Sequence, residues 1–351
     1  MKKKILPIFI LLISLALVGV GIAYAYLSSP VDKNSTEEIQ IEIKSGYTSR
    51  KIAEVLEEKG LIRNKYVFLL ELKIYKRGTL KAGTYSLNKS MNLQEIIDSL
   101  ENSKGITLNV KITFREGETI TDLAKVIEKN TNHTYDEVIE KLNSKEYLNE
   151  LISKYWFLTE DILDENIYYP LEGYLAPNTY HFENEDTSIE TIVKTMLDEE
   201  DKILSKYKDV VMKDPHYYLT MASITQLEGT NEENRKMIAG IFENRLKVGM
   251  NLGSDVTTYY AFQIKMTEPL DGSLFQKSNP YNTRAADMGG KMPIGPICNP
   301  DESSIISAVS PTESDYYFFV ADSEKNIYYS KTDAEHQATI ARLKKEGKWL
   351  W

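Results

Sequence analysis

A single carboxylate closes an apolar segment in the second half of this chain. The stretch "TMASITQLEGT", residues 220–230, reads as the end of a buried helix whose small and apolar residues are Met221, Ala222, Ile224 and Leu227. Glu228 follows them, and Gly229 is of a type that often ends helices. Burying a charge costs free energy unless the charge is paired or serves a function such as catalysis. Apolar surroundings raise the pKa of a carboxyl group, so Glu228 is a candidate acid catalyst. The structural alternative is an exposed glutamate at a helix end.

Other catalytic chemistries have little support in the sequence. It contains no GxSxG, Walker or GxGxxG pattern, and its single cysteine, Cys298, can form neither an intramolecular disulfide nor a CxxC site. The histidines lie far apart, match no HExxH pattern and are interpreted as surface or structurally satisfied residues: His133, His181, His216 and His336. We therefore expect no metal and no cofactor. The net charge of −10 disfavours nucleic-acid binding.

The N-terminal segment predicts a membrane anchor. Residues 5–27, "ILPIFILLISLALVGVGIAYAYL", carry no charge and follow Lys2, Lys3 and Lys4. A helix of this length covers about 30 Å of hydrocarbon. We predict a cytoplasmic tail over 1–4, a transmembrane helix over 5–27 and a polar linker over 28–38, with the rest of the chain outside the cell. The alternative is a cleaved signal peptide, because "AYA" at 23–25 resembles a cleavage site, although the apolar region of such peptides is about 7–15 residues long.

A strand–turn–helix pattern occurs twice after the anchor. "IKSGYTSRKIAEVLEEK" (43–59) aligns with "FREGETITDLAKVIEKN" (114–130) at an offset of 71 residues, and each copy follows an alternating stretch typical of a strand. The pattern predicts tight turns at Gly46 and Gly117 and helix N-caps at Thr48 and Thr119. The first copy opens a small α+β module over 39–105. Such a module binds glycans or only braces a neighbour, and we favour bracing because no binding signature is visible.

The elements that must position Glu228 follow in the second half of the chain. Residues 216–228 and 235–250 read as two helices joined by a polar turn. An irregular run rich in proline and glycine covers 269–304, and runs of this length are usually functional loops. "DYYFFVAD" and "NIYYSK" predict a hairpin, and residues 332–346 a closing helix. These alternations indicate an α+β protein.

Several longer motifs carry a family resemblance. They are "ASITQLEGTNEENRKMIAGIFENRLKVGMNLGSDVTTYYA", "LEGYLAPNTY", "SNPYNTR", "GKMPIGPICNP" and "DYYFFVADSEKNIYYSKTDAEH". The sequence resembles the MltG (YceG-like) family of membrane-anchored endolytic murein transglycosylases from the anchor to about residue 340. The resemblance implies a transmembrane helix, a LysM-like α+β module over 39–105, and a mixed α/β catalytic domain over 106–351 that begins with the strand–helix unit 106–150.

The resemblance also implies a reaction. The family's catalytic glutamate closes an Ala-Ser-[Ile/Leu]-x-x-x-Glu pattern, which falls on Glu228. Glu228 would protonate the leaving oxygen of the β-1,4 bond after N-acetylmuramic acid. It would then take the C6 hydroxyl proton of the same sugar, which closes a 1,6-anhydro ring. One carboxyl group suffices because the nucleophile is intramolecular, whereas ordinary glycosidases need two.

This sequence departs from the family pattern twice. Members often carry an acidic residue where Gln226 stands, and a glutamine where Gly253 stands. The first departure leaves Glu228 as the only carboxylate of its motif, and the second puts a sugar contact at 253 in doubt.

Supporting residues are expected in the motifs around Glu228. The candidates for substrate binding are Asn244, Arg245, Asp255, Thr257, Tyr259, Tyr281, Asn282, Thr283, Pro293, Gly295, Pro296, Asn299 and Glu172. Asn and Thr can hydrogen-bond N-acetyl groups, and Tyr can stack on a sugar ring. Each is as readily structural: Arg245 can pair with a carboxylate, and the prolines can stiffen their loop.

Two alternative functions remain open. One is a peptidoglycan hydrolase in which Glu172 or Asp255 activates water, and the other is a non-catalytic wall-binding scaffold of the synthesis machinery. A degenerate scaffold is expected to lose Glu228, which this chain retains. The expected partners are peptidoglycan glycan strands and, from the resemblance, the peptidoglycan synthases of cell elongation.

Overall fold

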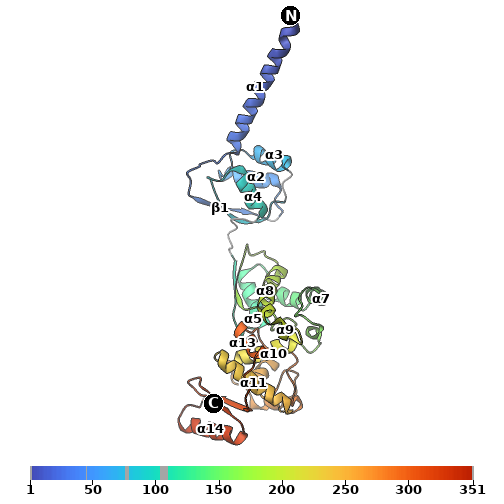
Figure 1. Ribbon diagram of the computed structural model, residues 1–351, viewed down its shortest axis with the longest axis vertical. Coiled ribbons are helices and arrows are strands. Elements are labelled where there is room, and N and C mark those ends of the chain that lie inside the picture. Colours follow the sequence, from blue (N-terminus) through green and yellow to red (C-terminus); the bar gives the residue numbers. More distant parts are fainter. Residues whose placement is uncertain (1, 45, 76–78, 103–109, 350–351) are drawn as a thin grey trace. The chain divides into compact units, whose positions relative to one another are not determined.

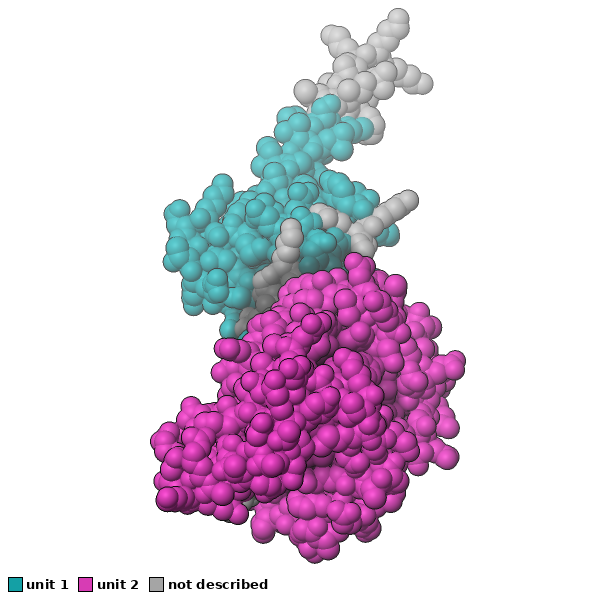
Figure 2. All heavy atoms as spheres, turned by 60° about the horizontal axis from the view of Figure 1, so that its bottom comes forward, with its two compact units in different colours: residues 1–111, 181–185 teal, residues 112–180, 186–351 magenta. Residues whose placement is uncertain are grey.

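The computed structural model describes residues 2–44, 46–75, 79–102 and 110–349, with the side chains of 2–12 outside the description. Residues 1–111 and 181–185 form one unit, and residues 112–180 and 186–351 form the other (Figures 1 and 2). The predicted domain boundary at 105/106 lies outside the described residues. Helices and small sheets make up both units, which confirms the predicted mixed α+β class.

The first unit begins with helix α1 (Lys2–Ser28). The side chains of residues 5–12, where the predicted transmembrane span starts, lie outside the described residues. In the part of the chain that the structure covers, no helix combines the length and apolarity needed to cross a membrane.

A small module follows α1 in the order β1 (Glu38–Ile43), α2 (Ser49–Glu58), α3 (Lys65–Ile74), β2 (Gly83–Asn88) and α4 (Leu93–Asn102). The two strands pair antiparallel, with Ile41 opposite Tyr85. Apolar side chains from both strands and from helices α2–α4 form its core, including Leu56, Phe68 and Ile97.

The predicted strand–turn–helix repeat is confirmed. β1 leads into α2, and β3 (Val110–Phe114) leads into α5 (Ile120–Asn130). Gly46 and Gly117 have φ angles of +84° and +76°, a region that favours glycine. Thr48 and Thr119 are the N-caps of the two helices, and Thr119 forms a capping box with Asp122.

The second unit contains the helices that surround Glu228. After α5 come α6 (Tyr135–Leu142), α7 (Lys145–Lys154), the short helix η1 (Glu160–Leu163) and β4 (Asn178–Phe182), which pairs with β3. Then follow α8 (Ile189–Leu204), η2 (Ser205–Tyr207), α9 (Lys208–Val211), α10 (Pro215–Glu228) and α11 (Glu232–Lys247). Helix α10 packs against α11, α12 (Asp255–Ala261) and α13 (Glu302–Val309).

The predicted irregular run mostly lacks regular structure. Only the short helices η3 (Gly272–Gln276) and η4 (Ala286–Met288) interrupt it before α13 begins at Glu302. The predicted hairpin is present as β5 (Phe318–Ala321) and β6 (Ile327–Ser330), with Phe319 opposite Tyr329. The predicted closing helix is present as α14 (Asp333–Lys345), and it packs against both strands of this hairpin.

Candidate active site around Glu228

Helix α10 places Glu228 at its last position. Asp214 caps the helix by accepting a hydrogen bond from the Tyr217 backbone N–H at 2.9 Å, and Pro215 occupies the first turn. The interior residues 219–225 are buried because neighbouring helices cover them. The apolar segment read from the sequence is therefore a core helix whose final residue meets a pocket.

Gly229 allows the chain to turn tightly after Glu228. A Cβ atom at this position would lie 2.4 Å from Arg235 Cγ, so a larger residue would force Arg235 away. Arg235 is needed there, because its Nε donates to the Gly229 carbonyl and its Nη1 binds the Asp301 carboxylate at 2.8 Å. The turn fixes the end of α10 between α11 and the N-terminus of α13.

Glu228 lines a pocket of about 530 Å³. Its polar lining includes Arg245, Asp255, Arg284 and His336, and its apolar lining includes Val256, Phe319, Ile327, Ile340 and Trp349. The Glu228 side chain is partly exposed at the pocket. Its Oε1 accepts a hydrogen bond of 2.5 Å from Ser254 Oγ. The carboxyl group is thus held on one side and accessible on the other.

The surroundings of Glu228 favour its protonated form. Burial raises the pKa of this carboxyl group, and the Asp255 carboxylate raises it further. The hydrogen bond from Ser254 and the positive charges of Arg245 and Arg284 oppose this shift. Burial is the largest of these effects, so the pKa lies above that of an ordinary glutamate.

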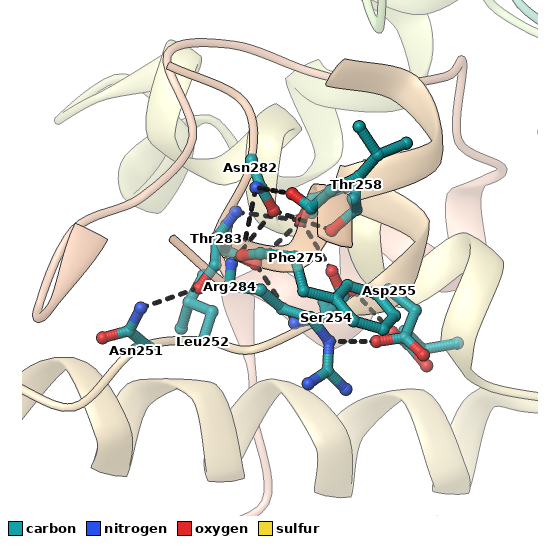
Figure 3. A network of polar contacts seen from close by, with 12 residues as sticks. Asn251, Leu252, Ser254, Asp255, Thr258, Phe275, Asn282, Thr283 and Arg284 are labelled. Atoms are coloured by element: carbon teal, nitrogen blue, oxygen red, sulfur yellow. Dashed lines mark hydrogen bonds and ion pairs between the residues drawn. The ribbon is translucent and has the colours of Figure 1, made fainter. Parts of the chain in front are cut away.

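Asp255, the second carboxylate of the pocket, is paired with Arg284 through an ion pair to the arginine Nε (Figure 3). Arg284 also lies over the Phe275 ring, with its Cζ 4.5 Å from the ring centroid. The Asp255 carboxylate is therefore engaged by a cation, whereas the Glu228 carboxyl group accepts a hydrogen bond from a neutral hydroxyl.

Arg245 is a buried cation that joins three parts of the site. Its Nε donates to the Tyr317 carbonyl at 2.6 Å, and its Nη1 donates to the Leu252 carbonyl. Burial lowers the pKa of Arg245 to about 10, while Glu228 raises it. Arg245 therefore fixes the hairpin and the loop before α12 around Glu228, and its charge acts on the Glu228 carboxyl group.

A buried network of hydroxyl and amide groups supports the loop that carries Ser254. Thr283 Oγ1 accepts from the Ser254 backbone N–H at 3.1 Å and lies 2.8 Å from Thr257 Oγ1. Asn282 accepts from Thr258 Oγ1 at 2.7 Å and donates to three carbonyls of the η3 loop (Figure 3). These side chains hold the irregular run against α12.

Glu172 is fully buried and does not line the Glu228 pocket. It accepts hydrogen bonds from the Ile120 backbone N–H at 3.1 Å, from Asn299 Nδ2 at 2.8 Å and from Tyr260 Oη at 3.2 Å. Burial, the largest effect, raises the pKa of Glu172 to about 8. This carboxyl group joins the start of α5, the proline-rich loop and α12.

The other predicted residues divide into pocket and scaffold. Tyr259 lines the pocket with Glu228, Arg245 and Asp255. Asn244 donates to the carbonyls of Ser314 and Tyr316. The remaining candidates are buried and do not line the Glu228 pocket: Thr257, Tyr281, Asn282, Thr283, Pro293, Gly295, Pro296 and Asn299. Of these, Thr257, Asn282 and Thr283 support the loop that carries Ser254.

Gln226 and Gly253, where the sequence departs from the family pattern, have different environments. Gln226 Oε1 accepts from the Asp301 backbone N–H at 2.9 Å and from Ser304 Oγ at 2.7 Å, so it caps the start of α13. Gly253 lines the pocket with a φ angle of +62°, which a side chain at this position would strain.

Sequence reasoning missed the polar residues Ser254, Arg284, His336 and Trp349 of this site. Ser254 was overlooked between two named neighbours, although its hydroxyl type was a usable signal. His336 and Trp349 line the pocket because the C-terminal hairpin and α14 close it, which no local pattern near Glu228 indicates. Among the described residues, no group of His, Cys, Asp or Glu side chains is arranged to hold a metal ion.

The second repeat unit also meets this site. A Cβ atom at Gly117 would lie 3.3 Å from Leu227 Cδ2, so the turn before α5 packs directly on the end of α10. A second pocket, of about 440 Å³, lies between this turn and α12. It shares Leu227, Val256, Tyr259 and Met266 with the Glu228 pocket, so the two are adjacent.

Residues 41–342 match the model of the YceG-like family, and the chain belongs to this family. It is 36% identical over 300 residues to a Bacillus subtilis protein named endolytic murein transglycosylase, an alignment that covers 83% of this chain and 82% of the relative. A Streptococcus pneumoniae protein of the same name is 31% identical over 330 residues, 86% of this chain and 58% of that longer relative.

A solved structure agrees with this assignment. The crystal structure of a YceG-like protein from Listeria monocytogenes is 34% identical and superposes with a TM-score of 0.61, covering 86% of this chain and 99% of that one. The expected family is confirmed, and the names of the relatives match the enzyme class that the resemblance implied.

Proposed function

We propose that this chain is an endolytic murein transglycosylase that cleaves the β-1,4 bond after N-acetylmuramic acid within glycan strands and leaves 1,6-anhydro ends. Family membership and the names of the relatives support the enzyme class. The observation that supports this reaction is that the two carboxylates of the pocket, Glu228 and Asp255, have different surroundings. Glu228 has a raised pKa and an accessible side, whereas Asp255 is ion-paired with Arg284.

In this mechanism Glu228 acts first as an acid and then as a base. Protonated Glu228 gives its proton to the glycosidic oxygen as the C1–O bond breaks. The C6 hydroxyl of the same sugar then bonds to C1, and its proton returns to the Glu228 carboxylate. The proton is recovered and water takes no part. Ser254 Oγ, bound to Oε1, leaves Oε2 as the oxygen that faces the substrate.

The adjacent second pocket supports cleavage within strands. A strand bound at Glu228 extends beyond the broken bond, and the surface beyond the Leu227–Tyr259 edge is hollow and lined by tyrosines and threonines. Tyrosine faces and hydroxyl groups suit sugar rings.

The product decides between this reaction and hydrolysis. Purified glycan strands digested in ¹⁸O-labelled water should yield unlabelled 1,6-anhydro ends, lighter by one water than hydrolysed ends. Labelled reducing N-acetylmuramic acid ends would establish the hydrolase alternative. An intact substrate under conditions in which a known lytic enzyme cleaves it would favour the scaffold alternative.

We further propose a cell-membrane location with the N-terminus in the cytoplasm and the catalytic unit outside. The support is the uncharged run over 5–27 after Lys2, Lys3 and Lys4. Protease added to intact spheroplasts should then digest residues 39–351, and protection of these residues would contradict the location.

The LysM-like identity of the module over 39–105 and an association with the synthases of cell elongation are also proposals. The order β1–α2–α3–β2, with its paired antiparallel strands, supports the first. Co-purification of the full-length chain with such a synthase would test the second, and failure of the two purified proteins to associate would count against it.

A further inference from the structure

The C-terminal segment forms one wall of the Glu228 pocket. Its contribution comes from the hairpin, α14 and the residues after it: Phe319, Val320, Ala321, Ile327, His336, Ile340 and Trp349. Most of this wall is apolar, and its hydrogen-bonding side chains are His336 and the indole of Trp349. A sugar in the pocket carries hydroxyl and amide groups that need partners once water is removed.

His336 is held in place by packing. Its ring stacks on Phe318, with centroids 5.4 Å apart and planes inclined by 27°. The Arg245 guanidinium lies over the same Phe318 ring, with Cζ 5.7 Å from the centroid. The imidazole therefore belongs to the same packed cluster as the cation that acts on Glu228.

The hydrogen-bonding capacity of His336 is incompletely used. Its Nδ1 is buried and has no hydrogen-bond partner among the described residues. Burial lowers the pKa of His336, and the charge of Arg245 on α11 lowers it further, whereas Asp333 on its own helix raises it. These surroundings favour the neutral ring, and a neutral imidazole offers one donor and one acceptor.

We propose that His336 is a substrate-binding residue of the Glu228 pocket, in which its imidazole hydrogen-bonds a hydroxyl or N-acetyl group of the bound amino sugar. The inference rests on the proposed function for the class of substrate. Trp349 and Ile340 supply the apolar surface beside that group. The wall built by the C-terminal segment thereby orients the sugar toward Glu228.

Two variants separate hydrogen bonding from packing. His336→Phe keeps an aromatic ring to stack on Phe318 and removes both nitrogens, whereas His336→Gln restores a donor and an acceptor. We expect His336→Phe to raise KM for soluble glycan strands about tenfold, the effect of losing one buried hydrogen bond. The changes in kcat and in melting temperature should be small. His336→Gln should recover part of the affinity. His181→Phe, at an exposed histidine outside both pockets, is the control.

A wild-type KM in His336→Phe would overturn the proposal. Equal KM values for folded His336→Phe and His336→Gln would also overturn it, because a packing role does not distinguish the two. The ends produced by the wild-type protein are identified in the same digest. Hydrolysed ends would refute the transglycosylase function, but the effect of the His336 variants on KM could still be measured.

Discussion

Ser254 Oγ donates a hydrogen bond of 2.5 Å to Glu228 Oε1, across 26 residues of sequence. Ser254 is nearly fully buried and sits at the N-cap of α12, yet its hydroxyl makes no capping hydrogen bond. The hydroxyl is therefore committed to the glutamate. It orients the carboxyl group and leaves its second oxygen for the substrate.

Replacing Glu228 by glutamine should abolish cleavage while the fold persists. Gln keeps the shape and the acceptor for Ser254 but cannot transfer a proton. Loss of a general acid typically costs about 10²–10⁴ in rate. Release of 1,6-anhydro ends measures the rate, and thermal unfolding measures stability. Glu165→Gln, at an exposed glutamate, is the control. Normal activity of the Glu228 variant would remove this residue from the mechanism.

Asp255→Asn should move the alkaline limb of the pH–activity profile to lower pH. Asp255 raises the pKa of Glu228, so removing its charge lowers that pKa. A general acid must be protonated, and activity falls as pH rises through its pKa. The rate of 1,6-anhydro end formation from pH 4 to about 9 tests this. Asp136→Asn, at an exposed position on α6, should leave the limb unchanged. A shift to higher pH would contradict this arrangement.

Ser254→Ala should shift the same limb in the opposite direction. Its hydrogen bond lowers the pKa of Glu228, and its removal therefore raises that pKa. We also expect a fall in kcat of about tenfold, because the carboxyl group loses its orientation and about 1 kcal/mol of hydrogen bonding. Ser254→Thr keeps the hydroxyl and should retain the wild-type limb. Identical profiles for the Ala variant and the wild type would show that the contact has no catalytic role.

Glu172→Gln should change the dependence of stability on pH and leave the product type unchanged. The pKa of Glu172 is about 8 in the folded chain, above the 4.5 of an ordinary glutamate, so the folded state binds more protons between these values. The contribution of Glu172 to the free energy of unfolding is fully present below about pH 4.5. It is lost as pH rises through about 8, and the loss amounts to a few kcal/mol at most. Denaturant unfolding at pH 5 and pH 8 measures how much stability the wild type and the variant each lose between these pH values. An equal loss of stability between pH 5 and pH 8 in both proteins would contradict the raised pKa of Glu172.

Many helices, turns and strands of both units could be predicted from the sequence because their signals are local. The apolar run before Glu228 specified a buried helix, and the glycine–threonine pairs at 46/48 and 117/119 specified turns and caps through backbone conformation. The alternating aromatic stretches specified the hairpin. Each follows from periodicity or from a residue's intrinsic φ preference, and neither requires knowledge of distant residues.

Tertiary structure decided which polar residues meet Glu228. The sequence offered Glu172 and Asp255 as second carboxylates, but packing buried Glu172 among donors from three segments and paired Asp255 with Arg284. His336 lies 108 residues after Glu228 and joins its pocket only because the hairpin and α14 fold back over it. The sequence by itself predicted the helix that ends at Glu228, and the family resemblance singled out this residue as the candidate acid. The environment that sets its pKa, and the wall that faces it, arise from contacts between distant segments, and these contacts leave no periodic trace in the chain.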